Sequence, residues 1–167
     1  MTTLQNCVNY LRSTGVPFAH TTHSAAYTAA EVALAEHIPA NRLAKTVMVR
    51  DDESYVMVVV PADADVDLAR LRTVVGASEL YPADERDLFR FFPNAEVGAM
   101  PPLGSLFNFR VYLDRKVANR EFIAFNAGSH RDFIHMRVSD FWELIHPVLG
   151  DFCEVSASAG ARRGSRP

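Results

Sequence analysis

Lys45 is the first residue whose type and position suggest chemistry. Of the 17 basic residues in the 167-residue chain, only Lys45 and Lys116 are lysines. A lysine ammonium is a compact charge that can bind a phosphate or a carbonyl oxygen, whereas arginine presents a planar fork. Lys45 precedes the apolar run 46–49, and α/β sheets commonly bind ligands at strand ends. We therefore treat Lys45 as a candidate site residue; the alternative is a side chain that reaches solvent from a strand edge.

The segment 96–105 is a second candidate, because two glycines and two prolines fall within ten residues. Proline fixes φ and glycine permits close approach, so such a loop can aim successive N–H groups at an anion or a developing oxyanion. The alternative is a structural loop without a ligand. The candidate donors are the backbone N–H groups of Gly98, Ala99, Met100 and Leu103.

The turn after the predicted strand 121–125 brings together a glycine, a hydroxyl and an imidazole, as Gly128, Ser129 and His130. Arg131 occupies the second position after Ser129, so the Gly-x-Ser-x-Gly elbow of serine hydrolases is absent. A serine nucleophile therefore lacks its usual frame. The alternative is that Ser129 and His130 satisfy backbone groups of the turn.

We expect neither a metal nor another cofactor. His20 and His23, with His130 and His135 as distant partners, do not have the helical His-Glu-x-x-His spacing. Dinucleotide-binding and P-loop glycine motifs are also absent. The two cysteines stand near opposite ends of the chain and match no disulfide framework, which favours a reducing, cytoplasmic location.

Hydrophobic periodicity predicts one α/β domain around a mixed sheet over residues 1–150, followed by a disordered tail over 151–167. Asp67 and Ser139 are predicted helix caps, and Thr28 with Glu31 forms a capping-box pattern. The predicted helices span 3–14, 28–37, 67–75, 83–92 and 140–145. The predicted strands span 16–20, 43–50, 55–60, 109–113, 121–125 and 133–138.

Charge is unevenly distributed along a chain whose formal net charge is −3. Residues 51–87 carry a net −7, whereas residues 108–137 carry a net +3. The total argues against a general nucleic-acid coat protein, but the basic segment together with Arg42 and Lys45 could form a local anion-binding face. No apolar run approaches the ~18 residues of a membrane span, so we expect no membrane association.

Taken together and in order, these motifs resemble the YbaK and prolyl-tRNA synthetase-associated editing-domain family. The resemblance covers most of residues 10–145. It implies a barrel-like, mostly antiparallel sheet flanked by helices and a freestanding deacylase that hydrolyses mischarged aminoacyl-tRNA. The matching segments are 23–32, 43–49, 98–102 and 125–130.

The resemblance also implies roles for individual residues. It implies ester hydrolysis by a positioned water with help from the tRNA's own ribose hydroxyl, without a metal or a protein nucleophile. Thr46 stands where several relatives carry another small polar residue such as asparagine. This difference leaves open which aminoacyl group the site accepts. The implied catalytic residues are Lys45, Gly128, Ser129 and His130. The implied substrate-binding residues are His23, Tyr27, Thr46, Gly98, Ala99, Met100, Pro101 and Pro102.

The implied partners are the tRNA acceptor end and, transiently, an aminoacyl-tRNA synthetase. By the same resemblance, the expected substrate is a small amino acid such as Ala, Ser or Thr, on the proline tRNA. The alternative is a non-catalytic module that binds tRNA or an aminoacyl-adenylate, because the sequence contains no self-contained nucleophile–base pair.

Overall fold

The chain begins with helix α1 (Thr3–Thr14), as its apolar spacing predicts. The computed structural model describes residues 1–27, 30–31 and 42–155. The side chains of Thr2 and Gln5 form a capping box, and Gly15 ends the helix in the left-handed conformation at φ 75°. Cys7 and Leu11 are fully buried, so α1 packs on the rest of the molecule through this face.

Most of the predicted elements are present, with short additional ones between them. The predicted helix over 28–37 lies largely outside the described residues. The other described helices of the element order are α3 (Leu68–Val75), α4 (Glu85–Phe91), α5 (Gly104–Phe107), α6 (Arg115–Ala118) and α7 (Val138–Ile145). The strands are β1 (Ala19–Thr22), β2 (Ala44–Arg50), β3 (Tyr55–Pro61), β4 (Ala64–Val66), β5 (Tyr81–Pro82), β6 (Arg110–Asp114), β7 (Phe122–Asn126), β8 (Asp132–Arg137), β9 (Val148–Gly150) and β10 (Cys153–Val155).

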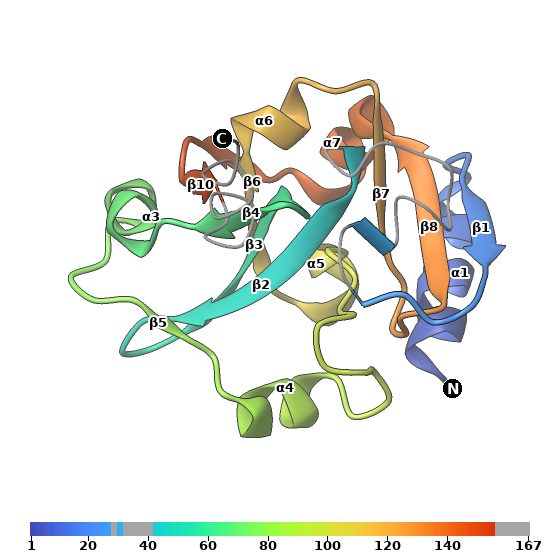
Figure 1. Cartoon of the computed structure of the whole chain (residues 1–167), viewed down its shortest axis with the longest axis horizontal. Coiled ribbons are helices and arrows are strands. Elements are labelled where there is room, and N and C mark those ends of the chain that lie inside the picture. The colour runs from blue at the N-terminus through green and yellow to red at the C-terminus, as the bar shows by residue number, and fades with distance from the viewer. Residues whose placement is uncertain (28–29, 32–41, 156–167) are drawn as a thin grey trace, which may run out of the picture.

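The described strands form three sheets, with the orders β1-β8-β7, β10-β4 and β5-β2-β3-β6-β9. Figure 1 shows the five-stranded sheet crossing the middle of the molecule, with β7, β8 and β1 standing beside it next to α1. Pairing is antiparallel except where β6 lies parallel to β3 and β9. The predicted α/β class with a mixed, mostly antiparallel arrangement is confirmed, although the described strands do not close into a barrel.

Both faces of the five-stranded sheet are covered, which explains why β3 is an uninterrupted apolar run. Ala44 and Met48 of β2 belong to the largest buried cluster, together with side chains of α1, β7 and α7. Val49, on the opposite face of β2, belongs to a second cluster, to which α3 contributes Leu71. Alternating residues of β2 therefore face different layers of the molecule.

The start of β1 and the N-cap of α7 differ from the sequence prediction. Strand β1 begins at Ala19 rather than at residue 16, because its register follows β8, with Ala19 opposite His135. The predicted Ser139 cap is wrong: β8 runs directly into α7, whose N-cap is Arg137 and makes no side-chain capping bond.

Residues 151–155, placed in a tail by the sequence analysis, instead belong to the folded part. Phe152 is fully buried, and β10 pairs with β4. The buried Asp114 carboxylate accepts the N–H groups of Phe152 and Cys153, each at 2.9 Å. The rest of the predicted tail, residues 156–167, lies outside the described residues.

Candidate active site

The loop before α5 and the turn between β7 and β8 are joined by reciprocal backbone hydrogen bonds. Glu96 N–H donates to Gly128 O at 2.9 Å, and Gly128 N–H donates to Ala99 O at 2.8 Å. Gly128 has φ 95°, and a Cβ there would lie 2.7 Å from Thr3 Cβ, so the turn fits closely against α1. The two segments therefore form one structural unit.

His130 is held by the same loop. Its backbone N–H donates to Glu96 Oε2 at 3.0 Å, and its ring Nε2 lies 2.9 Å from Val97 O. Because a carbonyl oxygen only accepts, Nε2 carries the proton in this hydrogen bond. The imidazole also faces Gly98, where an added Cβ would lie 3.6 Å from the His130 ring. Any proton exchange with a ligand would therefore use Nδ1.

The segment 23–27 continues the β1–β8 ladder and lies along the same turn. His23 N–H donates to Arg131 O at 3.0 Å, and Ala26 N–H donates to His130 O at 3.1 Å. The His23 ring stacks on Phe133 with centroids 5.1 Å apart. Tyr27 follows at the surface, 68% exposed, with its ring centroid 4.6 Å from that of His130. Three of the four sequence motifs thus meet at one place.

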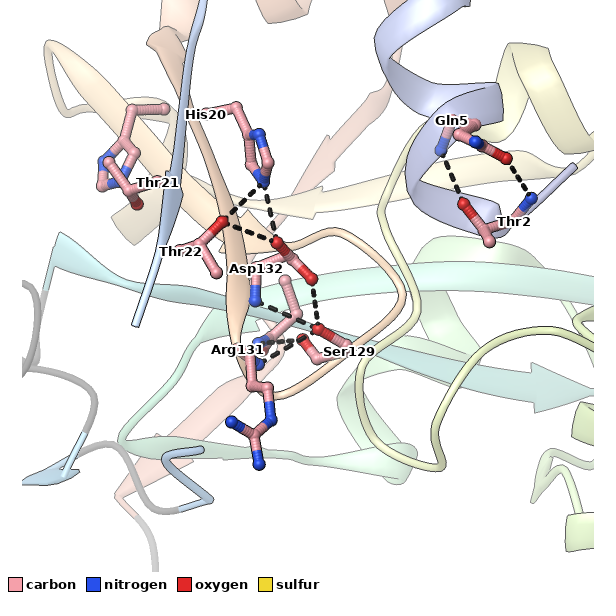
Figure 2. A network of polar contacts seen from close by, with 10 residues as sticks. Thr2, Gln5, His20, Thr21, Thr22, Ser129, Arg131 and Asp132 are labelled. Atoms are coloured by element: carbon pink, nitrogen blue, oxygen red, sulfur yellow. Dashed lines mark hydrogen bonds and ion pairs between the residues drawn. The ribbon is translucent and has the colours of Figure 1, made fainter. Parts of the chain in front are cut away.

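The Ser129 hydroxyl is engaged within the turn. It donates to Asp132 Oδ2 at 2.7 Å and accepts the N–H groups of Arg131 and Asp132, as Figure 2 shows. The other oxygen of Asp132 contacts His20 Nε2 at 2.8 Å and accepts the Thr22 hydroxyl at 3.0 Å. His20 therefore bonds to the Asp132 carboxylate and not to the Ser129 hydroxyl. Ser129 and His20 do not form a nucleophile–base pair.

Asp132 has a lowered pKa in this network. Burial alone would raise the pKa of its carboxyl, but hydrogen bonds from Ser129, His20 and Thr22 together outweigh burial. The carboxylate is thus the charged centre that fixes the turn.

Lys45 is the second residue of β2. Its ammonium forms an ion pair with Asp65 Oδ1 at 3.3 Å, and the two side chains are 32% and 49% exposed. Leu43, two residues earlier and therefore on the same face, packs in a small buried cluster with Ala26, Ala124 and Phe133. This cluster connects the beginning of β2 to the segment 23–27 and to β7 and β8, although Lys45 makes no hydrogen bond to the turn within the described chain.

Thr46 points the opposite way, as alternation along a strand requires. It lies between Ala44 and Met48, and Met100 and Leu103 of the loop belong to the same buried cluster. Thr46 Oγ1 is shielded from solvent and has no hydrogen-bond partner among the described residues. The side chains of Lys45 and Thr46 therefore lie on opposite faces of β2.

One of the four backbone N–H groups predicted as candidate donors to a ligand is already engaged in the structure. Ala99 N–H donates to Glu96 O at 3.0 Å, which leaves the N–H groups of Gly98, Met100 and Leu103 as candidates. Pro101 and Pro102 are buried. Gly98 has φ 83° and is exposed, so its peptide borders the solvent beside His130.

Two features are absent from the described residues. No group of three or more His, Cys, Asp or Glu side chains in them is arranged to hold a metal ion. No helix among them is long and apolar enough to cross a membrane.

Sequence reasoning did not single out Glu96 or Asp132, although both hold the site together. The Ser-x-x-Asp spacing of Ser129 and Asp132 is a local signal of a side-chain-stabilised turn. Glu96 offers no comparable signal, because its contact with His130 joins positions 34 residues apart.

Known proteins resemble this chain in sequence and in fold. The aminoacyl-tRNA editing domain family matches residues 23–144. Proline–tRNA ligases of Caldicellulosiruptor saccharolyticus and Bacillus cytotoxicus are each 32% identical, over 63% and 62% of the chain. These matches cover 18% and 20% of the ligases, so the chain spans about a fifth of their length.

Solved structures share the fold. A candidate trans-editing enzyme for prolyl tRNA synthetase superposes with a TM-score of 0.80 at 18% identity, covering 92% of this chain and 98% of its own. A hypothetical protein gives a TM-score of 0.81, also at 18% identity, covering 89% of this chain and 99% of its own.

Proposed function

The chain belongs to the aminoacyl-tRNA editing domain family, and from that premise we propose that it is a trans-editing deacylase. Its reaction would hydrolyse the ester bond between a tRNA and a wrongly attached amino acid. The observation that carries the proposal is the meeting of segment 23–27, loop 98–102 and turn 128–130 at one place, beside the strand that bears Lys45.

The chemistry follows from what the site offers. Water attacks the ester carbonyl, a tetrahedral oxyanion forms, and the tRNA hydroxyl leaves with a proton. Fixed backbone N–H groups stabilise such an oxyanion without reorganising, by about 2.7–4 kcal/mol for a donor where this has been measured. The N–H groups of Gly98 and Met100 are the donors we assign to this role. Ser129 is assigned to positioning, because its hydroxyl already serves the turn.

Lys45 is assigned to the substrate's phosphate or carbonyl oxygen. Its ion pair with Asp65 is partly exposed, and such pairs contribute only about 0–1 kcal/mol. A substrate oxygen can therefore compete for the ammonium. His23, Tyr27 and His130 would enclose the aminoacyl group, with His130 Nδ1 as the available ring nitrogen.

We propose that the amino acid removed is small, such as Ala, Ser or Thr. We propose the proline tRNA as its carrier because the matched relatives are proline–tRNA ligases. The pocket must discriminate by size, and one methylene is worth only about 1–3 kcal/mol in such pockets. Transient association with the corresponding synthetase and a cytoplasmic location complete the proposal.

The test is deacylation of a panel of aminoacyl-tRNAs by the wild-type protein, by Lys45→Ala and by Lys116→Ala. Lys116 is the matched control, an exposed lysine on α6. We expect release of a small amino acid, a loss of at least about a hundredfold in Lys45→Ala, and wild-type rates in Lys116→Ala. Survival of every ester in the presence of folded protein would refute the proposal.

A second function, binding without turnover, is favoured by one observation: the Ser129 hydroxyl is bonded to Asp132 and not to a histidine. Retention of tRNA with no release of amino acid above background would support this alternative. Multiple turnovers per protein molecule would exclude it.

A further inference from the structure

A cavity of about 310 Å³ lies beside the beginnings of β2 and β7, and its described lining contains none of the residues assigned to the proposed reaction. The β-bridge between Leu43 and Ala124 brings these strand ends together. Arg42 precedes Leu43, which packs with Ala26 and Phe133 next to the candidate site. The volume of the cavity lies at the lower end of the range for pockets that hold small ligands. The described lining residues are Arg42, Arg120, Glu121 and Phe122.

Arg120 lines this cavity, and one of its guanidinium nitrogens is an unsatisfied donor. Its Nη1 atom is shielded from solvent and has no hydrogen-bond partner in the described part of the chain. Burial lowers the pKa of the Arg120 guanidinium and Arg42 adds to this effect, while Asp63, Cys153 and Asp114 oppose it. A buried donor without an acceptor costs free energy, and rotation of the Arg120 guanidinium towards an anionic oxygen in the cavity would recover it. Two arginines beside one cavity therefore favour a phosphate group.

Phe122 adds a second, different preference. Its side chain is 47% exposed at the cavity, and Arg137 Cζ lies 5.4 Å from its ring centroid. Glu121 is the acidic member of the described lining, and Arg137 Nη1 lies 3.7 Å from its Oε1, which offsets that charge. An exposed aromatic ring among arginines is the composition that binds single-stranded nucleic acid, by stacking a base while cations hold the backbone.

We propose that this cavity binds one nucleotide of single-stranded RNA, with Arg42 and Arg120 on the phosphodiester and Phe122 stacked on the base. The inference rests on the proposed function in identifying that RNA as the unpaired acceptor end of the tRNA. Lys45 and the loop 98–102 would then act on the aminoacylated nucleotide, and the cavity would hold a preceding one. A base paired within a duplex cannot present its face to Phe122, so a single strand is required.

The experiment measures fluorescence anisotropy of a labelled single-stranded RNA ending in CCA, with the same RNA annealed to its full complement as comparison. The full chain is tested as wild type, Arg42→Gln and Phe122→Leu, whose original side chains are both exposed. Arg110→Gln is the matched control: Arg110 is exposed and pairs with Val56, whereas Ala44, next to the cavity, pairs with Pro61 at the other end of β3.

We expect each cavity variant to weaken single-strand binding about tenfold. Arg42→Gln should also reduce the slope of log affinity against log salt by about 0.7–1, whereas Phe122→Leu should leave the slope unchanged. The control and the wild type should bind alike. Unchanged affinity in both cavity variants, or equal binding of single strand and duplex, would overturn the inference.

Failure of this inference and failure of the proposed function give different results. If Lys45→Ala abolishes deacylation while both cavity variants bind RNA normally, the deacylase stands and the cavity assignment is wrong. If RNA binding depends on the cavity but no ester is hydrolysed, the cavity assignment stands and the deacylase is wrong.

Discussion

Turn 128–132 and the Lys45 side chain belong to the same candidate site but are held in very different ways. The turn is fixed by backbone bonds to the loop, by the Glu96 and Asp132 carboxylates, and by contact with α1. Lys45 is held by one partly exposed ion pair to Asp65. The turn is therefore held rigidly, whereas the charge of Lys45 can exchange its partner.

This difference fits the tasks we propose for them. Backbone donors stabilise a transition state only if they are already in place, so the segment that presents them must not move. An ammonium that must leave one carboxylate for a substrate oxygen needs a weak resting contact. Substitutions in the turn should therefore change stability most, and substitutions around Lys45 should change activity most.

Gly128→Ala should have the largest effect on stability. A side chain at φ 95° costs about 1–2 kcal/mol, and its Cβ would lie 2.7 Å from Thr3 Cβ, so we expect a total loss of about 3–5 kcal/mol in urea unfolding. Gly15→Ala is the control, since Gly15 has φ 75° but nothing within 4 Å of the added Cβ. Its loss should be only the backbone cost of about 1–2 kcal/mol. Equal losses would show that the turn is not tightly fitted to α1.

Asp132→Asn should be next, costing about 1.5–3 kcal/mol at neutral pH because charge-assisted hydrogen bonds from three side chains are weakened. The pKa of Asp132 is lowered in the folded protein, so the carboxylate's contribution is complete above its ordinary value of 3.8. That contribution disappears as pH falls through the lower folded value.

The measurement for Asp132→Asn is urea unfolding of the wild type and the variant from neutral pH down to acid. Their difference in unfolding free energy should shrink towards acid pH. Asp52→Asn, at an exposed carboxylate, provides the control and should match the wild type throughout. A difference that stayed constant with pH would contradict the role of the charge.

Asp65→Asn should have the smallest effect on stability, less than about 1 kcal/mol, because the pair with Lys45 is partly exposed. Deacylation should remain at or above the wild-type rate, since Lys45 keeps its charge and loses a competitor. Loss of activity as large as that of Lys45→Ala would show instead that Asp65 holds Lys45 in its working position.

The elements that the sequence predicts well are those whose signals are local. The hairpin of β2 and β3 follows from two apolar, β-branched runs around a polar stretch, and α3 from the Asp67 cap. By contrast, β10 depends on the Asp114 carboxylate, which accepts backbone N–H groups 38 and 39 positions further on. No local sequence pattern predicts a hydrogen-bond partner that far away in the chain.

The same distinction applies to the site. Lys45, the loop 98–102 and the turn 128–130 are visible as residue types in unusual surroundings. Sequence alone could not show that Ala99 N–H is already engaged or that Ser129 serves Asp132, because those facts depend on partners chosen by the fold. Arg120 appeared only as one charge among several, and its unsatisfied Nη1 required the packing around it.

The pairing of β1 with β8 also has a consequence for protein synthesis. Ala19–Thr22 can pair with its partner strand only after Asp132–His135 has left the ribosome. Contacts between such distant positions form late because loop closure must come first. A nascent chain that ends before Asp132 would therefore contain Lys45 without the turn that we assign to the same site.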